Sequence, residues 1–287
     1  MTQLHSATLL IHCADQRGLV SAVTEFIAKN GGNILSLEQH VDSLINQFFM
    51  RVQWDLNQFA IPDAKISEFF EVLIAKRFSM TWQLNFSDER QRMAVFVSKP
   101  SHCLYDILSR VQGGEWDVEV PLIISNHPDH AAIAKAFGIA FHHFAITPQN
   151  RAEQEQAQIA LMKEHNIDLV VLARYMIIVG RAFVEAFPQR VINIHHAFLP
   201  SFIGAKPYHR AYERGVKLIG ATAHYVTADL DEGPIIEQDV IRVSHLDSIA
   251  ELTRKGFDVE KIVLARAIRR HLERKTLVFG SRVMVFA

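Results

Sequence analysis

The sequence predicts an α/β protein with two domains. This prediction rests on the length of the chain and on a change in the order of the predicted strands and helices along it. A chain of 287 residues is long enough for about two domains. Its first part follows the order strand, helix, strand, strand, helix, strand, which is typical of a ferredoxin-like split βαβ unit. Its second part alternates short apolar runs with helical stretches, which indicates an open, mostly parallel, doubly wound sheet with helices on both faces.

Residues 1–86 are predicted to form the first domain. Apolar side chains recur at helical spacing at Leu19, Val23 and Ile27, and the glycines at 31 and 32 end that helix. The expected elements are a strand at 7–13, a helix at 19–30, strands at 33–42 and 46–56, a helix at 63–78 and a strand at 80–86.

The hydrophilic run "SDERQR", residues 87–92, is the predicted linker, and residues 93–287 are the predicted second domain. Short apolar runs in this domain read as buried strands of a parallel sheet. The expected strands are 93–98, 120–125, 168–173 and 191–196, with helices at 151–165 and 248–272 and a strand-like tail at 277–286.

The composition excludes several classes of protein. With 30 basic and 31 acidic residues the net charge is −1, which argues against a nucleic-acid binder, since that function requires a basic surface. Cys13 and Cys103 cannot form a disulfide framework, which favours a reducing compartment. The start of the chain lacks the features of a signal peptide, and no apolar run approaches a membrane span. We therefore expect a cytoplasmic protein that binds neither membranes nor nucleic acid.

The stretch "VINIHHAFLP", residues 191–200, is the strongest candidate for a functional site. Asn193 and His195 lie two residues apart, hence on one face of a strand, and ligands of open parallel sheets bind beyond the carboxyl ends of strands. Asp229 and Asp231 follow the next strand, before a Gly-Pro turn. An amide, an imidazole and a carboxylate could therefore converge to stabilise an oxyanion and transfer protons.

Two other interpretations of these residues stay open. Each polar residue could simply satisfy hydrogen bonds at a strand end. The 15 histidines also raise the possibility of a metal site, but the sequence has no HExxH motif and no cysteine pair, and His195 and His196 should point to opposite faces of their strand. We therefore expect no metal and no cofactor.

Longer motifs resemble a known family. "VINIHHAFLPSFIGAKPYHRAY" followed by "HYVTADLDEGPIIEQDV" is similar to the folate-dependent formyltransferase and hydrolase family. Together with "HCLYDIL", "PLIISNHPDH" and "DLVVLARYM", these motifs most resemble the formyltetrahydrofolate deformylases, over residues 92–275. The run "DQRGLVSAVTEFIAKNGGNI" resembles an ACT domain, which those deformylases also carry. The resemblance implies an ACT domain followed by a formyltransferase-type domain.

The resemblance also implies roles for individual residues. Asn193, His195 and Asp231 would be catalytic, and Asp231 is preferred to Asp229 because it directly precedes Glu232-Gly233-Pro234. The family's pterin-binding loop corresponds to "RYMIIV", and "TADLDEGP" would close the other side of that pocket. Ala197 stands where these deformylases usually have serine, so no hydroxyl role is expected there. The implied folate-binding residues are Met176, Ile177, Ile178, Val179, Asp229 and Gly233.

The acceptor of the formyl group is predicted to be water. Related transferases, which formylate a phosphorylated amine, carry a glycine-rich turn after the first strand whose N–H groups can cradle phosphate. Here residues 95–112 contain no glycine, and Pro100 lacks an N–H. The implied reaction is hydrolysis of 10-formyltetrahydrofolate to formate and tetrahydrofolate, which would supply formate for purine synthesis and balance one-carbon folate pools. A formyl transferase acting on an amine and a non-catalytic amino-acid or folate sensor are the alternatives.

The first domain is expected to bind an amino-acid effector. "DQRGL" offers backbone donors at the start of a helix, and the resemblance points to glycine and methionine as effectors. A purely structural dimerisation module is the alternative, whereas an RNA-recognition fold lacks support because its glycine-containing motif is absent. A homo-oligomer formed through the ACT domains is also expected. The candidate effector-binding residues are Asp15, Gly18, Leu19, Asn33 and Ile34.

Overall fold

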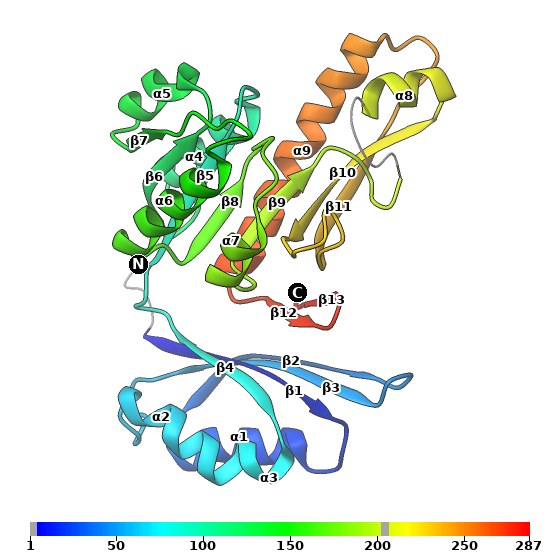
Figure 1. Ribbon diagram of the computed structural model, residues 1–287. Coiled ribbons are helices and arrows are strands. Elements are labelled where there is room, and N and C mark those ends of the chain that lie inside the picture. Colours follow the sequence, from blue (N-terminus) through cyan, green and yellow to red (C-terminus); the bar gives the residue numbers. More distant parts are fainter. Residues whose placement is uncertain (1–4, 202–206) are drawn as a thin grey trace. The chain divides into compact units, whose positions relative to one another are not determined.

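The computed structural model describes residues 5–201 and 207–287, and its chain divides into two compact units (Figure 1). The first comprises residues 1–90 with 274–277 and 284–287, and the second comprises residues 91–273 with 278–283. Both units are α/β, as the sequence predicts.

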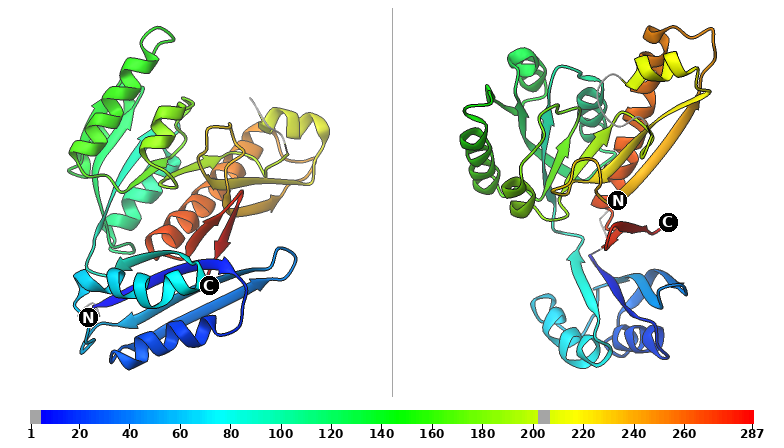
Figure 2. Two further views of the ribbon diagram at one scale, coloured as in Figure 1. Left: turned by 60° about the horizontal axis from the view of Figure 1, so that its bottom comes forward. Right: turned by 45° about the vertical axis from the view of Figure 1, so that its right-hand side comes forward.

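The N-terminal unit is a four-stranded antiparallel sheet in the order β2-β3-β1-β4. Its helices lie on one face of that sheet (Figures 1 and 2). There they bury an apolar core that includes Leu9, Ile11 and Val52 of the sheet and Val23 and Phe70 of the helices. The elements are β1 (Ser6–Ala14), α1 (Leu19–Lys29), β2 (Asn33–Asp42), β3 (Gln47–Asp55), α2 (Asp63–Phe70), a π-helical turn (Glu71–Ala75), α3 (Lys76–Phe78) and β4 (Thr81–Phe86).

The C-terminal unit is built on a seven-stranded sheet in the order β11-β10-β9-β8-β5-β6-β7. Neighbours from β7 to β9 are parallel, whereas β10 and β11 are antiparallel. This is the expected open, mostly parallel sheet. Its strands are β5 (Gln91–Val97), β6 (Val118–Ser125), β7 (Ala140–His143), β8 (Leu169–Leu172), β9 (Val191–His195), β10 (Leu218–Tyr225) and β11 (Ile235–Arg242).

Helices cover both faces of this sheet, so successive strand residues enter two different cores. In β5, Val95 packs with α4 (His102–Gln112) and α9 (Ile249–Leu272), whereas its neighbour Phe96 packs with α6 (Arg151–Glu164) and α7 (Arg181–Ala186). Burial on both faces explains why the parallel strands read as continuous apolar runs. The remaining helices are a 3₁₀ turn (Pro128–His130), α5 (Ala131–Ala136) and α8 (Pro207–Arg214).

The structure differs from the predicted domain boundaries in two places. Gln91 and Arg92, assigned to the linker, already belong to β5, since Arg92 is held by a hydrogen bond from its backbone N–H to Asp168. The tail forms a hairpin of β12 (Thr276–Phe279) and β13 (Arg282–Val285). Residues 274–277 and 284–287 of this tail cluster with the N-terminal unit, where Arg51 donates to the carbonyl of Arg274. The sequence prediction does not include β7 and β11, or the helices α4, α5, α7 and α8.

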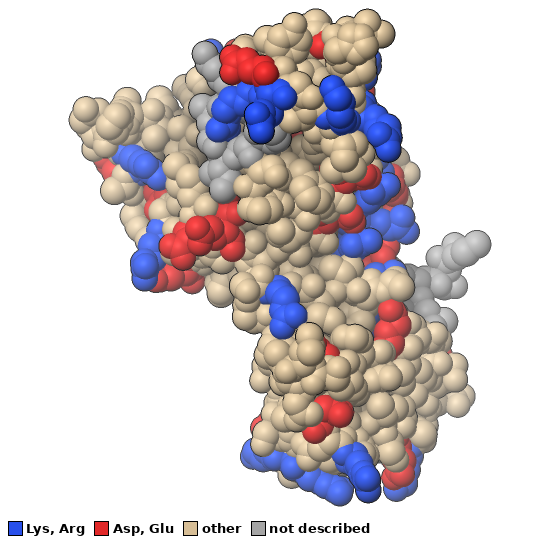
Figure 3. All heavy atoms as spheres, turned by 90° about the vertical axis from the view of Figure 1, so that its right-hand side faces the viewer, with Lys and Arg blue, Asp and Glu red and all other residues tan. Residues whose placement is uncertain are grey.

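Charged side chains of both signs are interspersed on the face seen in Figure 3. Surface ion pairs of the C-terminal unit include Arg266 with Asp239 at 2.8 Å. Among the residues that the structure describes, no helix combines the length and the apolar character needed to span a membrane.

Candidate active site

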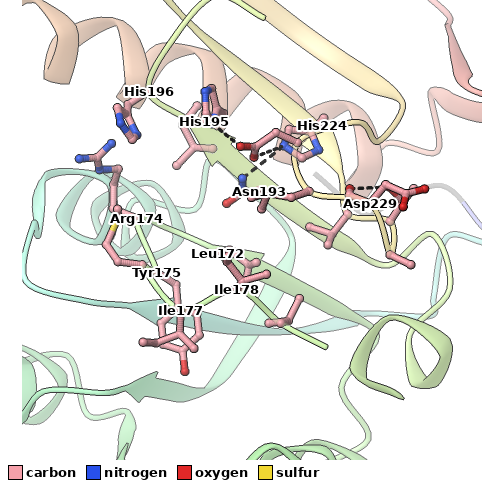
Figure 4. Close-up of a pocket in the computed structure, with 18 of the residues that line it drawn as sticks. Leu172, Arg174, Tyr175, Ile177, Ile178, Asn193, His195, His196, His224 and Asp229 are labelled. Carbon is pink, nitrogen blue, oxygen red and sulfur yellow. Dashed lines mark hydrogen bonds and ion pairs between the residues drawn. The ribbon is translucent and has the colours of Figure 1, made fainter. Parts of the chain in front are cut away.

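A cavity of about 560 Å³ opens in the C-terminal unit, where β8 and β9 end (Figure 4). This volume lies within the usual range of small-molecule binding sites. Three segments form most of its wall: the loop that follows β8, the end of β9, and the connection from β10 to β11. Its lining includes Leu172, Arg174, Tyr175, Met176, Ile177, Ile178, Val179, Asn193, His195, His196, His224, Thr227, Asp229 and Asp231.

The structure brings the three predicted catalytic residues together. Asn193 and His195 lie two residues apart at the end of β9 and both line the cavity. Nδ1 of His195 lies 3.3 Å from Oδ2 of Asp231. Nε2 of His195 is buried and has no hydrogen-bond partner among the described residues, which leaves this nitrogen available to a bound substrate.

The turn that carries Asp231 depends on a glycine two residues later. Asp231 has a left-handed backbone, with φ of 57°. A Cβ on Gly233 would lie 1.7 Å from the carbonyl oxygen of Tyr225, so no other residue fits there without moving the turn. Gly233 does not line the cavity, in contrast to the expectation from sequence. Its role is to allow the turn to approach β10 closely and thereby to place Asp231.

Asp231 is held in its ionised form. The hydrogen bond from His195 is the largest cause, followed by His224, and together they lower the pKa of this carboxyl well below its usual value. The carboxylate is therefore charged throughout the neutral range, as a group that orients water or holds a histidine requires.

His224 is a site residue that the sequence analysis missed. It lies opposite Asn193 in the pairing of β10 with β9, with 3.2 Å between its Nε2 and Nδ2 of Asn193 and 3.7 Å between Nε2 and Asp231. Its Nδ1 lies 3.0 Å from the carbonyl oxygen of Tyr225. Because a carbonyl only accepts, Nδ1 donates to it, which leaves Nε2 to accept from Asn193. His224 thereby fixes the orientation of the Asn193 amide.

The sequence predicts that His196 and His195 point to opposite faces of the strand, and this prediction is wrong. The strand ends at His195, and in the turn beyond it the two rings stack with centroids 5.2 Å apart. Burial, followed by the charge of Arg174, lowers the pKa of His196 to about 4. His196 is therefore a neutral wall of the cavity at physiological pH.

A buried polar cluster lies beside the cavity and consists of Arg174, Glu260, His102 and Tyr208. Glu260 is fully buried, and its two oxygens accept hydrogen bonds of 2.7 Å from His102 and from Tyr208. Burial alone would raise the pKa of Glu260, but the hydrogen bond from His102 and the charge of Arg174 outweigh it and lower the pKa. The cluster therefore contains a buried carboxylate close to Arg174.

His102, Cys103 and Glu260 form the one group of histidine, cysteine and acidic side chains in the described part of the chain whose spacing could suit a metal ion. Their chemistry fits a metal poorly. His102 and Glu260 are already hydrogen-bonded to each other, and burial raises the pKa of the Cys103 thiol well above its usual value. A protonated thiol is a weak ligand. We assign no metal to this group.

The loop that the resemblance assigns to pterin binding forms part of the cavity wall. Met176, Ile177, Ile178 and Val179 all line the cavity, as does Asp229 on the opposite segment. Met176 and Ile178 are about half exposed, at 55% and 52%, so apolar surface is available to a flat ring. The backbone N–H of Met176 donates to Ser98 at the end of β5, which fixes the loop.

The turn after β5 contains no glycine-rich phosphate cradle. Helix α4 begins at His102, whose imidazole is committed to the buried Glu260. Residues 98–101, between β5 and α4, contain no glycine, which agrees with the sequence prediction that a phosphate cradle is absent.

The predicted effector-binding residues do not meet within one chain. Asn33 lies opposite Asp55 and Asp42 opposite Gln47, while the N–H of Asp15 donates to the carbonyl of Asn46. Asp15, Gly18 and Leu19 therefore lie near one end of the sheet, and Asn33 and Ile34 lie at the other, roughly 27 Å away at about 3.4 Å per residue.

Comparison with known proteins first defines the class. Residues 91–268 match the Formyl transferase family, and residues 7–53 match the ACT domain family. The glycinamide ribonucleotide transformylase 1 of Symbiobacterium toebii superposes with a TM-score of 0.66 and 32% identity, over 71% of this chain and 98% of that one. The chain thus joins an ACT domain to a domain of the formyl transferase class.

Full-length similarity narrows the class further. The formyltetrahydrofolate deformylase of a Synechocystis species is 54% identical over 98% of this chain and 99% of that protein. The crystal structure of a formyltetrahydrofolate deformylase from Pseudomonas syringae pv. tomato superposes with a TM-score of 0.97 and 43% identity, over 100% of this chain and 96% of that one. The chain belongs to the formyltetrahydrofolate deformylase family.

Proposed function

We propose that this protein hydrolyses 10-formyltetrahydrofolate to formate and tetrahydrofolate. The observation that carries the proposal is the grouping of Asn193, His195 and Asp231 at the wall of a largely apolar cavity, in a chain of the deformylase family. The Met176–Val179 loop offers the apolar surface and backbone groups that a pterin ring requires. The reaction breaks the C–N bond of a formamide.

Catalysis starts with attack of water on the formyl carbon. Ionised Asp231 accepts a hydrogen bond from this water and holds His195 in place. The Asn193 amide, oriented by His224, and Nε2 of His195 in its protonated form donate to the oxyanion that develops.

Collapse of the tetrahedral intermediate completes the reaction. A C–O bond has formed, the C–N bond breaks, and the departing nitrogen takes up a proton delivered by His195 or relayed through Asp231. The products are formate and tetrahydrofolate, with both released from the same cavity. The protein's own side chains account for each proton, so no metal or cofactor enters the proposal.

A formyl transfer to a phosphorylated amine is the second candidate, favoured by the likeness to the transformylase from Symbiobacterium toebii. The absence of glycine between residues 95 and 112 supports water as the acceptor. The test is incubation with 10-formyltetrahydrofolate and no amine. We expect formate and tetrahydrofolate in equal amounts, and turnover that requires an amine would support the transferase.

The ACT unit is proposed to bind an amino acid, glycine or methionine, between two copies of the chain. Among the described residues β2 forms one edge of the sheet. Antiparallel pairing of two β2 edges around a two-fold axis would place Asn33 of one copy near the Asp15 end of the other, which unites the two separated sets of residues. The same pairing gives the proposed homo-oligomer. The proposed setting is the cytoplasm, where released formate would feed purine synthesis and balance the one-carbon folate pool.

A further inference from the structure

Arg174 is a buried cation whose hydrogen-bonding capacity is largely unused. Its side chain is 10% exposed and lines the cavity, and neither Nε nor Nη1 has a hydrogen-bond partner among the described residues. An arginine has five N–H donors, and burying them unpaired is costly. Such a group calls for an explanation.

Glu260 does not supply the missing partner. Both of its oxygens already accept hydrogen bonds of 2.7 Å, from His102 and from Tyr208. The distance from Nε of Arg174 to Glu260 is 3.5 Å, which is an ion pair at its outer range and not a hydrogen bond. The carboxylate balances the charge of Arg174 in part and leaves Nε and Nη1 without a hydrogen bond among the described residues.

The backbone holds Arg174 in this position. Arg174 has a left-handed conformation, with φ of 62°, which is unfavourable for a residue with a side chain. Its carbonyl oxygen accepts a hydrogen bond from the backbone N–H of Ser98. The backbone N–H of Met176, two residues further along the loop, donates to the hydroxyl of Ser98. The end of β5 thus fixes the loop so that the guanidinium lies beside His196 (Figure 4).

The position of Arg174 relates it to the reacting group. Its guanidinium lies beside His196, whose ring stacks on that of His195. His196 is neutral at physiological pH and therefore does not compete as a cation. The hydrolysis converts a neutral formamide into a carboxylate, so an anion appears in a cavity whose walls are largely apolar.

We infer that Arg174 is the binding residue for the carboxylate of the product formate. When the C–N bond breaks, the formyl carbon leaves as formate, and the guanidinium, which lines the cavity, donates N–H hydrogen bonds to this anion as it departs from His195. An arginine presents parallel donors that match a carboxylate. The inference rests on the proposed hydrolysis, because a transferase would release no formate at this site.

Product inhibition of the full-length protein tests the inference. Because formate has only three heavy atoms, its dissociation constant should be no tighter than the millimolar range. Formate at about 100 mM, with chloride replacing it at constant ionic strength, should therefore inhibit turnover of 10-formyltetrahydrofolate. Arg174→Lys keeps the charge but loses the paired donors, and should raise the inhibition constant for formate at least about tenfold. The inhibition constant of this variant for tetrahydrofolate should stay within about twofold of the wild-type value.

Two further variants keep the test decisive. Arg174→Met combined with Glu260→Gln removes both charges, so Glu260 is not left as an uncompensated buried anion. This double variant should remain folded by circular dichroism and lose formate inhibition. The control Arg266→Lys alters an exposed ion pair with Asp239, away from the cavity, and should change neither constant.

The inference fails under any of three results. The wild-type protein could show no inhibition by formate. The folded double variant could keep the formate constant of the wild type. The inhibition constant for tetrahydrofolate could rise as much as that for formate, which would mean that Arg174 binds a carboxylate of the folate itself. Release of formate without any amine, measured first, separates these outcomes from a failure of the proposed hydrolysis.

Discussion

Asp231 depends on its neighbours for its chemical state. The hydrogen bond from His195 and the nearby ring of His224 stabilise the carboxylate form, which lowers the pKa of Asp231 well below its usual value. The same contacts place it next to Nδ1 of His195. A neutral group of the same shape would keep the hydrogen bond but lose the charge that orients water and supports a protonated histidine.

Asp231→Asn should therefore reduce kcat by about 10²–10⁴-fold, the usual contribution of a general acid or base. Folate binding should change little, because the amide keeps the size of the carboxyl group. Steady-state kinetics and a binding titration with tetrahydrofolate measure the two effects. Asp229→Asn is the variant for comparison, since Asp229 also lines the cavity whereas Asp231 makes the ion pair with His195. Near-normal turnover of folded Asp231→Asn would remove this aspartate from the mechanism.

His196 should make the folded protein sensitive to acid. Its pKa is lowered to about 4 in the folded chain, by burial and by Arg174, from the ordinary value of 6.5. Below pH 6.5 His196 becomes protonated in the unfolded chain but stays neutral in the folded chain. The free energy of unfolding therefore falls as the pH drops from about 6.5 to about 4. Between pH 7 and pH 5 this one group should cost up to about 2 kcal/mol of the free energy of unfolding.

Urea unfolding at pH 7 and pH 5 measures that cost. In His196→Gln the loss of stability between the two pH values should be smaller than in the wild type by this amount. The control is His245→Gln, at an exposed histidine. An identical pH dependence in the wild type and in His196→Gln would show that His196 titrates normally in the folded protein.

At the scale of elements, the end of β9 and the turn from β10 to β11 make the site. Period-two alternation in β9 places Asn193 and His195 on one face, and the turn returns Asp231 to that face. The turn does so because Gly233 approaches the backbone of Tyr225.

Gly233→Ala should displace this turn, because its Cβ would lie 1.7 Å from the carbonyl oxygen of Tyr225. The expected cost is at least about 2 kcal/mol of stability, together with a large loss of kcat as Asp231 moves. Gly113→Ala is the control: its nearest atom would be the carbonyl oxygen of Ser109 at 3.1 Å, so a much smaller effect is expected. Thermal unfolding and kinetics of both variants decide the point, and a fully active, wild-type-stable Gly233→Ala would contradict the account.

Sequence periodicity predicted the elements of the N-terminal unit and the central strands of the C-terminal sheet, and motif spacing predicted the central residues of the site. Asn193, His195 and Asp231 were predictable because two of them share one strand and the third precedes a recognisable turn. His224 was missed because inside a strand pattern a single histidine gives no sign of the cross-strand partner that it meets. The cluster of Arg174, Glu260 and His102 was missed because its members come from segments far apart in the chain, which only tertiary packing brings together.

At the scale of the whole molecule, regulation requires the ACT unit to favour one state of the enzyme. A ligand changes turnover only if its affinities for the active and inactive states differ. Glycine or methionine should alter turnover at least about fivefold, within the usual range of such coupling. Asp15→Ala in the intact chain should abolish this response and keep the basal rate, whereas Asp88→Ala, at an exposed position, should keep both. A full response in Asp15→Ala, or no binding of either amino acid to the wild type, would leave the unit a structural module.

The identity of the acceptor is tested most directly in water labelled with ¹⁸O. The protein is incubated with 10-formyltetrahydrofolate in this water, with and without glycinamide ribonucleotide, and mass spectrometry follows formate and the amine. If water is the acceptor, each turnover yields one tetrahydrofolate and one formate that carries a single ¹⁸O atom, whether or not the amine is present. A formylated amine, produced at a rate comparable with the release of formate, would contradict the account and make the protein a transferase.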